Sequence, residues 1–127
     1  MEGNILMTGQ FDTYGKHCIV DFWGCDSQTI DNLSFMEALC VLAANAAGAT
    51  VVDVLYKKFD PQGLTILLLL EESHLSIHTY PEHGFVAFDC YTCSYLTQPG
   101  EAVGIFESIL KPKQTIKKFI ERGTLPN

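Results

Sequence analysis

Reactive side chains are concentrated in one segment, residues 71–93 of this 127-residue chain. The segment carries three of the four histidines and two of the five cysteines. A serine or cysteine beside a histidine can act as a nucleophile with its base, and histidines grouped with cysteines can bind zinc. We therefore take this segment as the candidate functional site, whose reactive residues are Glu72, Ser73, His74, His78, Glu82, Cys90 and Cys93.

A zinc site is disfavoured by the local sequence. The candidate ligands are His74 with His78, or His78 with Cys90 and Cys93. Histidines with this spacing share one side of a helix, but the β-branched residues and the proline that follow favour extended backbone. A single Cys-x-x-Cys pair is more typical of buried, unreactive thiols. We therefore expect no metal ion.

Two further readings of the segment remain. A Ser-His or Cys-His hydrolase needs an oxyanion hole and an oriented base, and the Gly-x-Ser-x-Gly elbow is absent. A binding module would use the same histidines only for structural hydrogen bonds. Taken one residue at a time, the binding module is the better interpretation.

The elements that position this segment alternate between strand and helix patterns. Ser34 and Glu37 fit a capping box, so a helix is predicted to begin at Ser34 and to end at Gly48. The first ten residues have no periodicity and are expected to form a loosely held arm. Strands are predicted at 17–23, 50–59, 64–70, 75–80 and 85–92, a second helix from Pro99 to Pro112, and a basic edge strand within 111–127.

This order, β-α-β-β-(β)-β-α-β with the short strand 75–80 in parentheses, predicts an α+β fold in one domain of residues 1–127, with two helices on one face of an antiparallel sheet. The helix faces are expected to be Phe35, Leu39, Leu42 and Ala46 in the first helix and Val103, Phe106, Ile109 and Leu110 in the second. The strand at 64–70 is apolar enough to be buried on both sides. We therefore expect a homodimer, an α/β/β/α sandwich in which the uncovered face packs on the sheet of an identical subunit.

Composition and charge exclude several partners. Fifteen acidic and eight basic residues give a net charge of -7, which repels nucleic acid and anionic membranes. No apolar run reaches the roughly 20 residues of a membrane span. Five cysteines, an odd number, without a signal peptide favour free thiols and a cytoplasmic location.

Blocks spread between Thr13 and Arg122 resemble the short prokaryotic type of S-adenosylmethionine decarboxylase proenzyme. The specific part is Glu-Ser-His at 72–74, Ile-His-Thr-x-Pro-Glu at 77–82 and Thr-Cys at 92–93. The other blocks are Thr-Tyr-Gly-Lys-His at 13–17, Gly-Cys-Asp at 24–26, Ala-Ala-Gly-Ala-Thr-Val-Val at 46–52 and Lys-Phe-Asp-Pro-Gln-Gly at 58–63.

The resemblance implies that the chain makes its cofactor from its own backbone. Ser73 would attack the Glu72 carbonyl, and elimination and hydrolysis would leave a pyruvoyl group at residue 73. The products would be a β chain of residues 1–72 and an α chain of residues 73–127. By the same resemblance His78 removes the α-proton during elimination, and Thr65 occupies the place of a serine that assists processing.

The resemblance also implies roles in catalysis and binding. The pyruvoyl ketone would form a Schiff base with S-adenosylmethionine, and Cys93 would return a proton to carbon after decarboxylation. Phe59 would stack on adenine, Glu82 would bind the ribose hydroxyls, and Tyr14 would form the other wall of the adenine slot. The product would serve spermidine synthesis, a branch of polyamine biosynthesis.

Two alternatives stay open at this stage. Ile66 stands where a glycine is common and, if it faced the pocket, would favour a smaller substrate such as ornithine or arginine for the same pyruvoyl chemistry. The other alternative, from a different class, is an unprocessed, non-catalytic paralogue that binds or regulates a partner.

Overall fold

The computed structural model describes residues 13–126, so the loosely held arm expected at the N-terminus lies outside the described residues. The elements follow the predicted order, with two short helical elements added, one α-helix and one 3-10 helix. They are β1 (Gly15–Trp23), α1 (Ser27–Ile30), α2 (Leu33–Ala46), β2 (Val51–Lys58), β3 (Leu64–Leu70), β4 (Ser73–Tyr80), the 3-10 helix η1 (Pro81–His83), β5 (Phe85–Thr92), α3 (Pro99–Leu110) and β6 (Gln114–Arg122).

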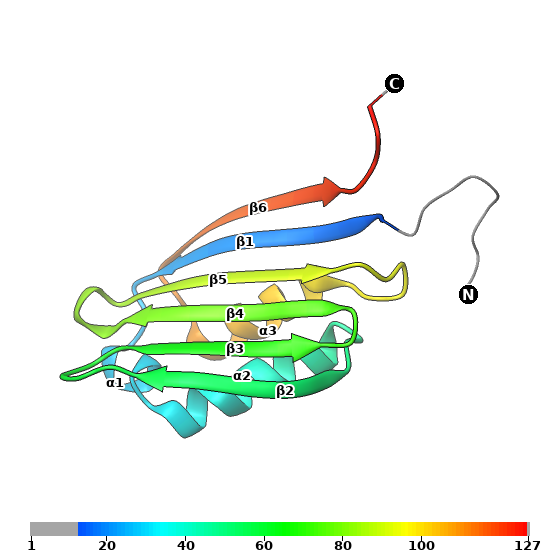
Figure 1. Cartoon of the computed structure of the whole chain (residues 1–127). Helices are drawn as coiled ribbons and strands as arrows, with labels where there is room; N and C mark the ends of the chain where they lie inside the picture. Colours follow the sequence, from blue (N-terminus) through cyan, green and yellow to red (C-terminus); the bar gives the residue numbers. More distant parts are fainter. Residues whose placement is uncertain (1–12, 127) are drawn as a thin grey trace.

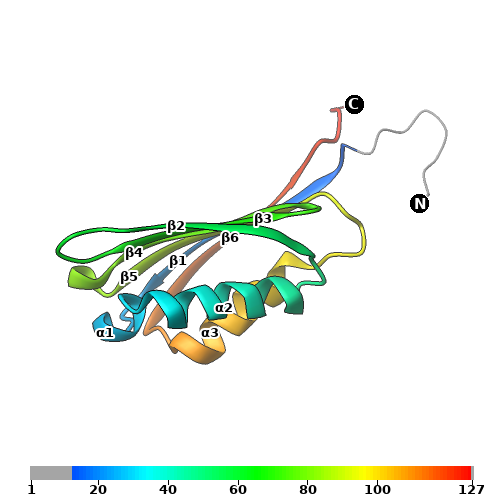
Figure 2. The same ribbon diagram turned by 60° about the horizontal axis from the view of Figure 1, so that its bottom comes forward.

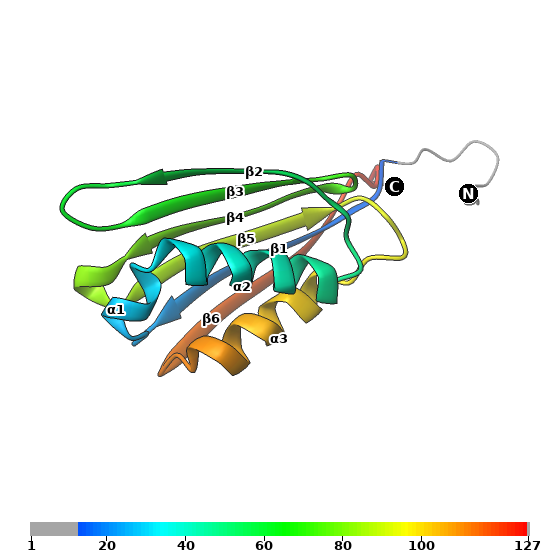
Figure 3. The ribbon, with the colours of Figure 1, turned by 90° about the horizontal axis from the view of Figure 1, so that it is seen from below.

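The strands form one antiparallel sheet in the order β2-β3-β4-β5-β1-β6 (Figure 1). The helices α2 and α3 lie beside each other on one face of this sheet, and no other element of residues 13–126 covers the opposite face (Figures 2 and 3). The prediction of an α+β fold with two main helices on one face is thus confirmed. We call the uncovered side the open face.

Strand β3 is buried by its own chain on one side only, so the expected burial of its other side depends on a second subunit. Successive side chains of a strand point to opposite faces, and here only one face is covered by helices. Ile66 and Leu68 on the helix side are fully buried, whereas Leu67 and Leu69 on the open face are 43% and 55% exposed. The apolar residues of β3 therefore lie on both faces of the sheet, and the chain itself buries only those on the helix side.

Helix α2 begins earlier than predicted. Asn32, not Ser34, is the N-cap, because its side-chain oxygen accepts a hydrogen bond of 3.0 Å from the Phe35 N–H. The expected capping box of Ser34 with Glu37 is therefore wrong. Asp26 caps the preceding helix α1 in the same way, and the sequence reading missed that helix.

The buried face of α2 is also rotated from the expected one. Phe35 and Leu42 are exposed, and the residues that pack on the sheet are Met36, Leu39, Cys40, Ala43 and Ala44. Because α2 is apolar nearly all round, periodicity alone does not fix its inner face.

Helix α3 begins at Pro99 as expected and buries Val103, Phe106 and Leu110, although Ile109 is exposed. The Phe106 ring packs on Phe22 and Phe88, with centroid distances of 5.7 and 4.9 Å, and this contact ties α3 to the middle of the sheet. Among residues 13–126, no helix is long and apolar enough to span a membrane.

Candidate active site

Ser73 lies at the first position of β4, immediately after the turn that leaves β3. Its φ angle is 154°, a backbone conformation that residues with side chains rarely adopt and that costs about 1–3 kcal/mol. A second contact holds the turn, because the N–H of Thr50, the residue before β2, donates to the Glu72 carboxylate at 3.2 Å. The peptide bond between Glu72 and Ser73 is therefore both fixed and strained.

The carbonyl oxygen of Glu72 accepts two hydrogen bonds from Cys93. The backbone N–H and the Sγ of Cys93 both lie 2.9 Å from this oxygen. Two donors on one carbonyl draw electron density from its carbon and stabilise an oxyanion formed there. The arrangement prepares the Glu72 carbonyl for attack by a nucleophile.

Cys93 is the exposed thiol among the five cysteines. Burial raises the pKa of Cys18 and Cys25 to about 11 and that of Cys90 to about 12. Buried thiols of this kind are inert, so Cys93 is the cysteine available for chemistry at this end of the sheet.

A second group of predicted site residues surrounds His78, near the C-terminal end of β4. The Thr65 hydroxyl lies 2.9 Å from His78 Nδ1 across the β3–β4 pair. A cavity of about 350 Å³ adjoins this pair, and its lining includes Phe59, Thr65, His78, Tyr80 and Glu82. This cavity combines an exposed aromatic ring, a carboxylate and a histidine.

The two groups do not meet within one chain. His78 follows Ser73 by five positions on the same strand, which places it about 16 Å away. Ser73, Glu72 and Cys93 therefore lie at one end of the sheet, and the residues around His78 lie at the other.

Tyr14 lies at the Ser73 end and not beside Phe59. Its ring stacks on Tyr95 with centroids 4.9 Å apart, and its hydroxyl donates to Glu121 at 2.7 Å. The bond to Glu121 raises the pKa of Tyr14 to about 12. One chain thus does not form the expected adenine slot between Tyr14 and Phe59.

Ile66 faces away from the candidate cavity. It is fully buried on the helix side of β3, whereas its neighbour Thr65 faces His78. The bulk of Ile66 therefore does not shrink this cavity, and the reason for expecting a smaller substrate is removed.

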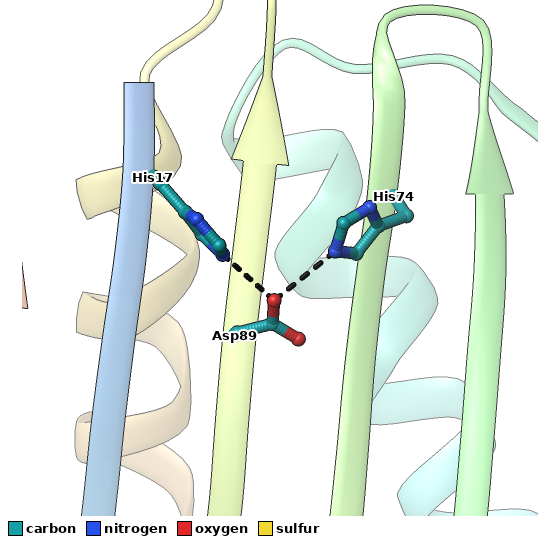
Figure 4. Close-up of side chains that lie close together, drawn as sticks. All are labelled: His17, His74 and Asp89. Carbon is teal, nitrogen blue, oxygen red and sulfur yellow. Dashed lines mark hydrogen bonds and ion pairs between the residues drawn. The ribbon is translucent and has the colours of Figure 1, made fainter. Parts of the chain in front are cut away.

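A cluster of three residues on the open face was missed by the sequence analysis (Figure 4). His17 Nε2 and His74 Nε2 lie 2.8 and 3.1 Å from the same oxygen of Asp89, which belongs to the strand between them. A single acidic residue in a strand carries no motif, so only the strand register reveals this cluster.

The zinc ligand sets considered from the sequence are not assembled. His74 bonds to Asp89, His78 bonds to Thr65, and Cys90 is buried in the core. The different group His17, His74 and Asp89 has one potential ligand atom from each residue within 4.8 Å of the others.

The environment of Thr92 was also not predictable from the sequence. Thr92 pairs with Ser73 across β4 and β5 and is fully buried. Within residues 13–126, its hydroxyl has no hydrogen-bond partner. A buried hydroxyl without a partner is energetically costly.

Known proteins resemble this chain over most of its length. Residues 16–123 match the family described as S-adenosylmethionine decarboxylase. S-adenosylmethionine decarboxylase proenzyme 2 of Bacillus cereus (strain ZK / E33L) is 52% identical over 114 residues, which cover 90% of this chain and 93% of that protein. A proenzyme of Methanococcus maripaludis (strain S2) is 43% identical over 111 residues, covering 87% and 91%.

The fold agrees with a solved member. The crystal structure of the adenosylmethionine decarboxylase from Aquifex aeolicus VF5 superposes with a TM-score of 0.83 at 36% identity, covering 90% of this chain and 94% of that one. Sequence and fold thus point to the same family. The chain belongs to the S-adenosylmethionine decarboxylase family.

Proposed function

We propose that this chain is a proenzyme that cleaves itself between Glu72 and Ser73 and then decarboxylates S-adenosylmethionine by means of a pyruvoyl group derived from Ser73. The observation that carries the proposal is the pair of hydrogen bonds from Cys93 to the Glu72 carbonyl, beside a strained Ser73. Cleavage yields a β chain of residues 1–72 and an α chain of residues 73–127.

Cleavage begins with attack of the Ser73 hydroxyl oxygen on the Glu72 carbonyl carbon. The C–O bond forms, the C–N bond breaks, and the proton of the hydroxyl passes to the released amine, so that the amide becomes an ester. The Cys93 N–H and thiol stabilise the negative charge that develops on the carbonyl oxygen. Strain at Ser73 favours the step because breaking the peptide bond releases it.

Elimination then separates the two chains. A base removes the α-proton of residue 73, the Cβ–O bond breaks, and Glu72 leaves as a carboxylate. Water then hydrolyses the resulting enamine, after its conversion to the imine, to a ketone and ammonia. His78 is the base that we propose, with Thr65 orienting it through the 2.9 Å contact to Nδ1.

The distance between Ser73 and its own His78 supports a dimer in which the histidine comes from the other copy. A two-fold axis that lies between two sheets, perpendicular to the strands, places each end of one sheet over the opposite end of the other. The partner subunit's His78 and the adjoining cavity then face Ser73. Each active site in this arrangement contains residues of both chains.

The open face has the composition that such a contact needs. It exposes large apolar side chains from strands across the whole sheet, a distribution typical of a surface that is covered in the working protein. These side chains are Ile19, Trp23, Leu55, Leu67, Leu69, Ile116 and Ile120. We therefore propose that a second copy of the chain packs on this face and forms the α/β/β/α sandwich.

The substrate contacts follow from the same cavity. Phe59 offers an exposed ring for the adenine base, and the Glu82 carboxylate can accept hydrogen bonds from both ribose hydroxyls. When present, the pyruvoyl ketone supplies the electron sink for loss of carbon dioxide. The exposed Cys93 thiol is the group that we propose to return a proton to the substrate carbon.

Mass spectrometry of the purified protein tests the proposal. We expect two chains that separate after residue 72, with residue 73 present as a pyruvoyl group, and release of carbon dioxide from carboxyl-labelled S-adenosylmethionine but not from ornithine or arginine. Ser73→Ala is the control and stays intact and inactive. A wild-type protein that remains one polypeptide with an unmodified serine overturns the proposal and favours a non-catalytic paralogue.

A further inference from the structure

The cluster of His17, His74 and Asp89 lies directly beside the proposed cleavage point. His74 is the residue that follows Ser73, so after cleavage it is the first ordinary residue of the α chain. Its side chain points toward Asp89 on the neighbouring strand (Figure 4). The cluster is therefore attached to the chain end that carries the reactive ketone.

Asp89 receives donors from both strands that flank it. His17 on β1 and His74 on β4 bond to one carboxylate oxygen, and the Ser76 hydroxyl on β4 bonds to the other. Burial disfavours the charged form of Asp89, but these hydrogen bonds outweigh it and hold the pKa of Asp89 below its usual range. The carboxylate is thus an ionised acceptor that joins β1, β5 and β4.

The surroundings of His17 fix the direction of its hydrogen bond. Arg122 Nη1 lies 3.4 Å from His17 Nδ1, and a guanidinium can only donate. The Nδ1 atom is therefore the acceptor, and the ring proton is on Nε2, which faces Asp89. Tyr91 packs its ring against His17 and lies under Arg122, so the imidazole is held on two sides.

The same geometry argues against a metal ion at this cluster. A metal would need the Nε2 lone pair of His17, which requires the proton to move to Nδ1. The Arg122 guanidinium faces Nδ1 and would then oppose an N–H donor. The cluster is better suited to hold a side chain in place than to bind a cation.

After cleavage, the new end of the α chain needs an anchor of this kind. In the uncut chain, Ser73 is fixed by the peptide bond to Glu72 and by pairing with Leu70 and Thr92. After cleavage the covalent link and the strain at residue 73 are both lost, and a strand end without anchorage frays. The first side chain that can hold the new end is that of His74.

We infer that Asp89, braced by His17, anchors His74 and thereby positions the ketone-bearing end of the α chain in the mature enzyme. Asp89 and His17 are positioning residues, since they contact neither Ser73 nor the Glu72 carbonyl among the hydrogen bonds of the described chain. The inference rests on the proposed function, because it concerns the end that self-cleavage creates.

The test compares Asp89→Asn with Asp21→Asn. Ile19 pairs with Asp89, and Asp21 is two residues after Ile19 on β1, so its side chain lies on the same face of the sheet as that of Asp89. Asp21 bonds to none of the cluster residues. We expect Asp89→Asn to cleave as the wild type does but to lose on the order of ten- to a hundred-fold in kcat with little change in KM, because the ketone is misplaced. Asp21→Asn should match the wild type.

Hydrogen exchange provides a second readout that does not depend on activity. Amides at the start of the α chain should exchange faster in cleaved Asp89→Asn than in cleaved wild type. In the uncleaved Ser73→Ala background, the same substitution should change exchange there very little, because the continuous chain holds residue 73. If Asp89→Asn does not fold, His74→Ala removes the anchor from the other side and should give the same pattern.

Three results overturn the inference even where the wild-type protein cleaves itself. In the first, Asp89→Asn matches Asp21→Asn in both kcat and hydrogen exchange. In the second, Asp89→Asn fails to cleave. In the third, Asp89→Asn raises hydrogen exchange at residue 73 and its neighbours as much in the uncleaved Ser73→Ala background as in the cleaved protein. An uncleaved wild type instead refutes the proposed function, and the inference falls with it.

Discussion

The two ends of strand β4 differ in how much of their chemistry one chain assembles. At the Ser73 end, the proposed nucleophile, the carbonyl that it would attack and the two donors to that carbonyl lie together, with Cys93 2.9 Å from the Glu72 oxygen. At the His78 end, the proposed base, the hydroxyl proposed to orient it and the proposed substrate cavity lie together without a bond to cleave. The comparison supports the proposal that each end is half of a site and that a second copy completes it.

The largest effect should follow from blocking the contact between copies. Leu69→Lys places a charge on the open face, where 55% of Leu69 is exposed. We expect a folded monomer that neither cleaves nor decarboxylates, because Ser73 no longer meets the partner subunit's His78. Sedimentation, circular dichroism and mass spectrometry measure the three properties.

Leu42→Lys is the matched control for that variant. Leu42 is 48% exposed on helix α2, away from the open face, so this variant should remain dimeric and cleave normally. A monomeric Leu69→Lys protein that still cleaves itself would show that one chain is sufficient for cleavage and that the two ends of β4 do not need a second copy.

At the Ser73 end, removal of the Cys93 thiol should separate cleavage from turnover. Cys93→Ala keeps the backbone N–H on the Glu72 carbonyl, so cleavage slows but continues. Loss of the general acid should lower kcat by roughly 10²- to 10⁴-fold. Gel analysis of cleavage and a carbon dioxide assay measure the two effects, and full turnover in Cys93→Ala would remove its assigned role.

At the His78 end, the orienting hydroxyl should have a smaller effect. Thr65→Val keeps the shape but removes the bond to His78 Nδ1, and we expect cleavage to slow by about tenfold. Thr65→Ser retains the hydroxyl and should cleave at nearly the original rate. Equal rates for Thr65→Val and Thr65→Ser would mean that the hydroxyl does not orient the histidine.

The sequence named the residues that we propose to be reactive, but it did not predict how the fold groups them. Ser73, Glu72, His78 and Cys93 follow from blocks at fixed spacing, because such chemistry needs specific residue types. Strand register determines that Cys93 contacts the Glu72 carbonyl and that His78 does not reach Ser73. The sequence blocks do not encode this register.

The same limit applies to local structure. The elements around the site were predictable from periodicity and turn residues, but the helix start was not, because Asn32 and Ser34 are both good N-cap residues. Asp89 was missed because one acidic residue in a strand resembles any solvent-facing side chain until its neighbours on β1 and β4 are known.

The smallest expected effects concern stability and compare buried hydroxyls at the two ends. Thr92 near Ser73 has a hydroxyl without a partner among residues 13–126, whereas the Thr79 hydroxyl accepts a bond of 2.9 Å from the Leu64 N–H. In the uncleaved Ser73→Ala background, Thr92→Val should raise the free energy of unfolding by about 1 kcal/mol and Thr79→Val should lower it by about 1–3 kcal/mol. Urea unfolding measures both, and a destabilised Thr92→Val would show that the hydroxyl has a partner.

The most direct test of the shared site is to combine two inactive chains of different mass, one with Ser73→Ala and one with His78→Ala, by co-expression. Each alone should stay uncleaved. In mixed dimers, the chain with His78→Ala should be cleaved, because its Ser73 meets the partner's His78, and one active site should form per dimer. Absence of cleavage in dimers shown to contain both chains would contradict the account.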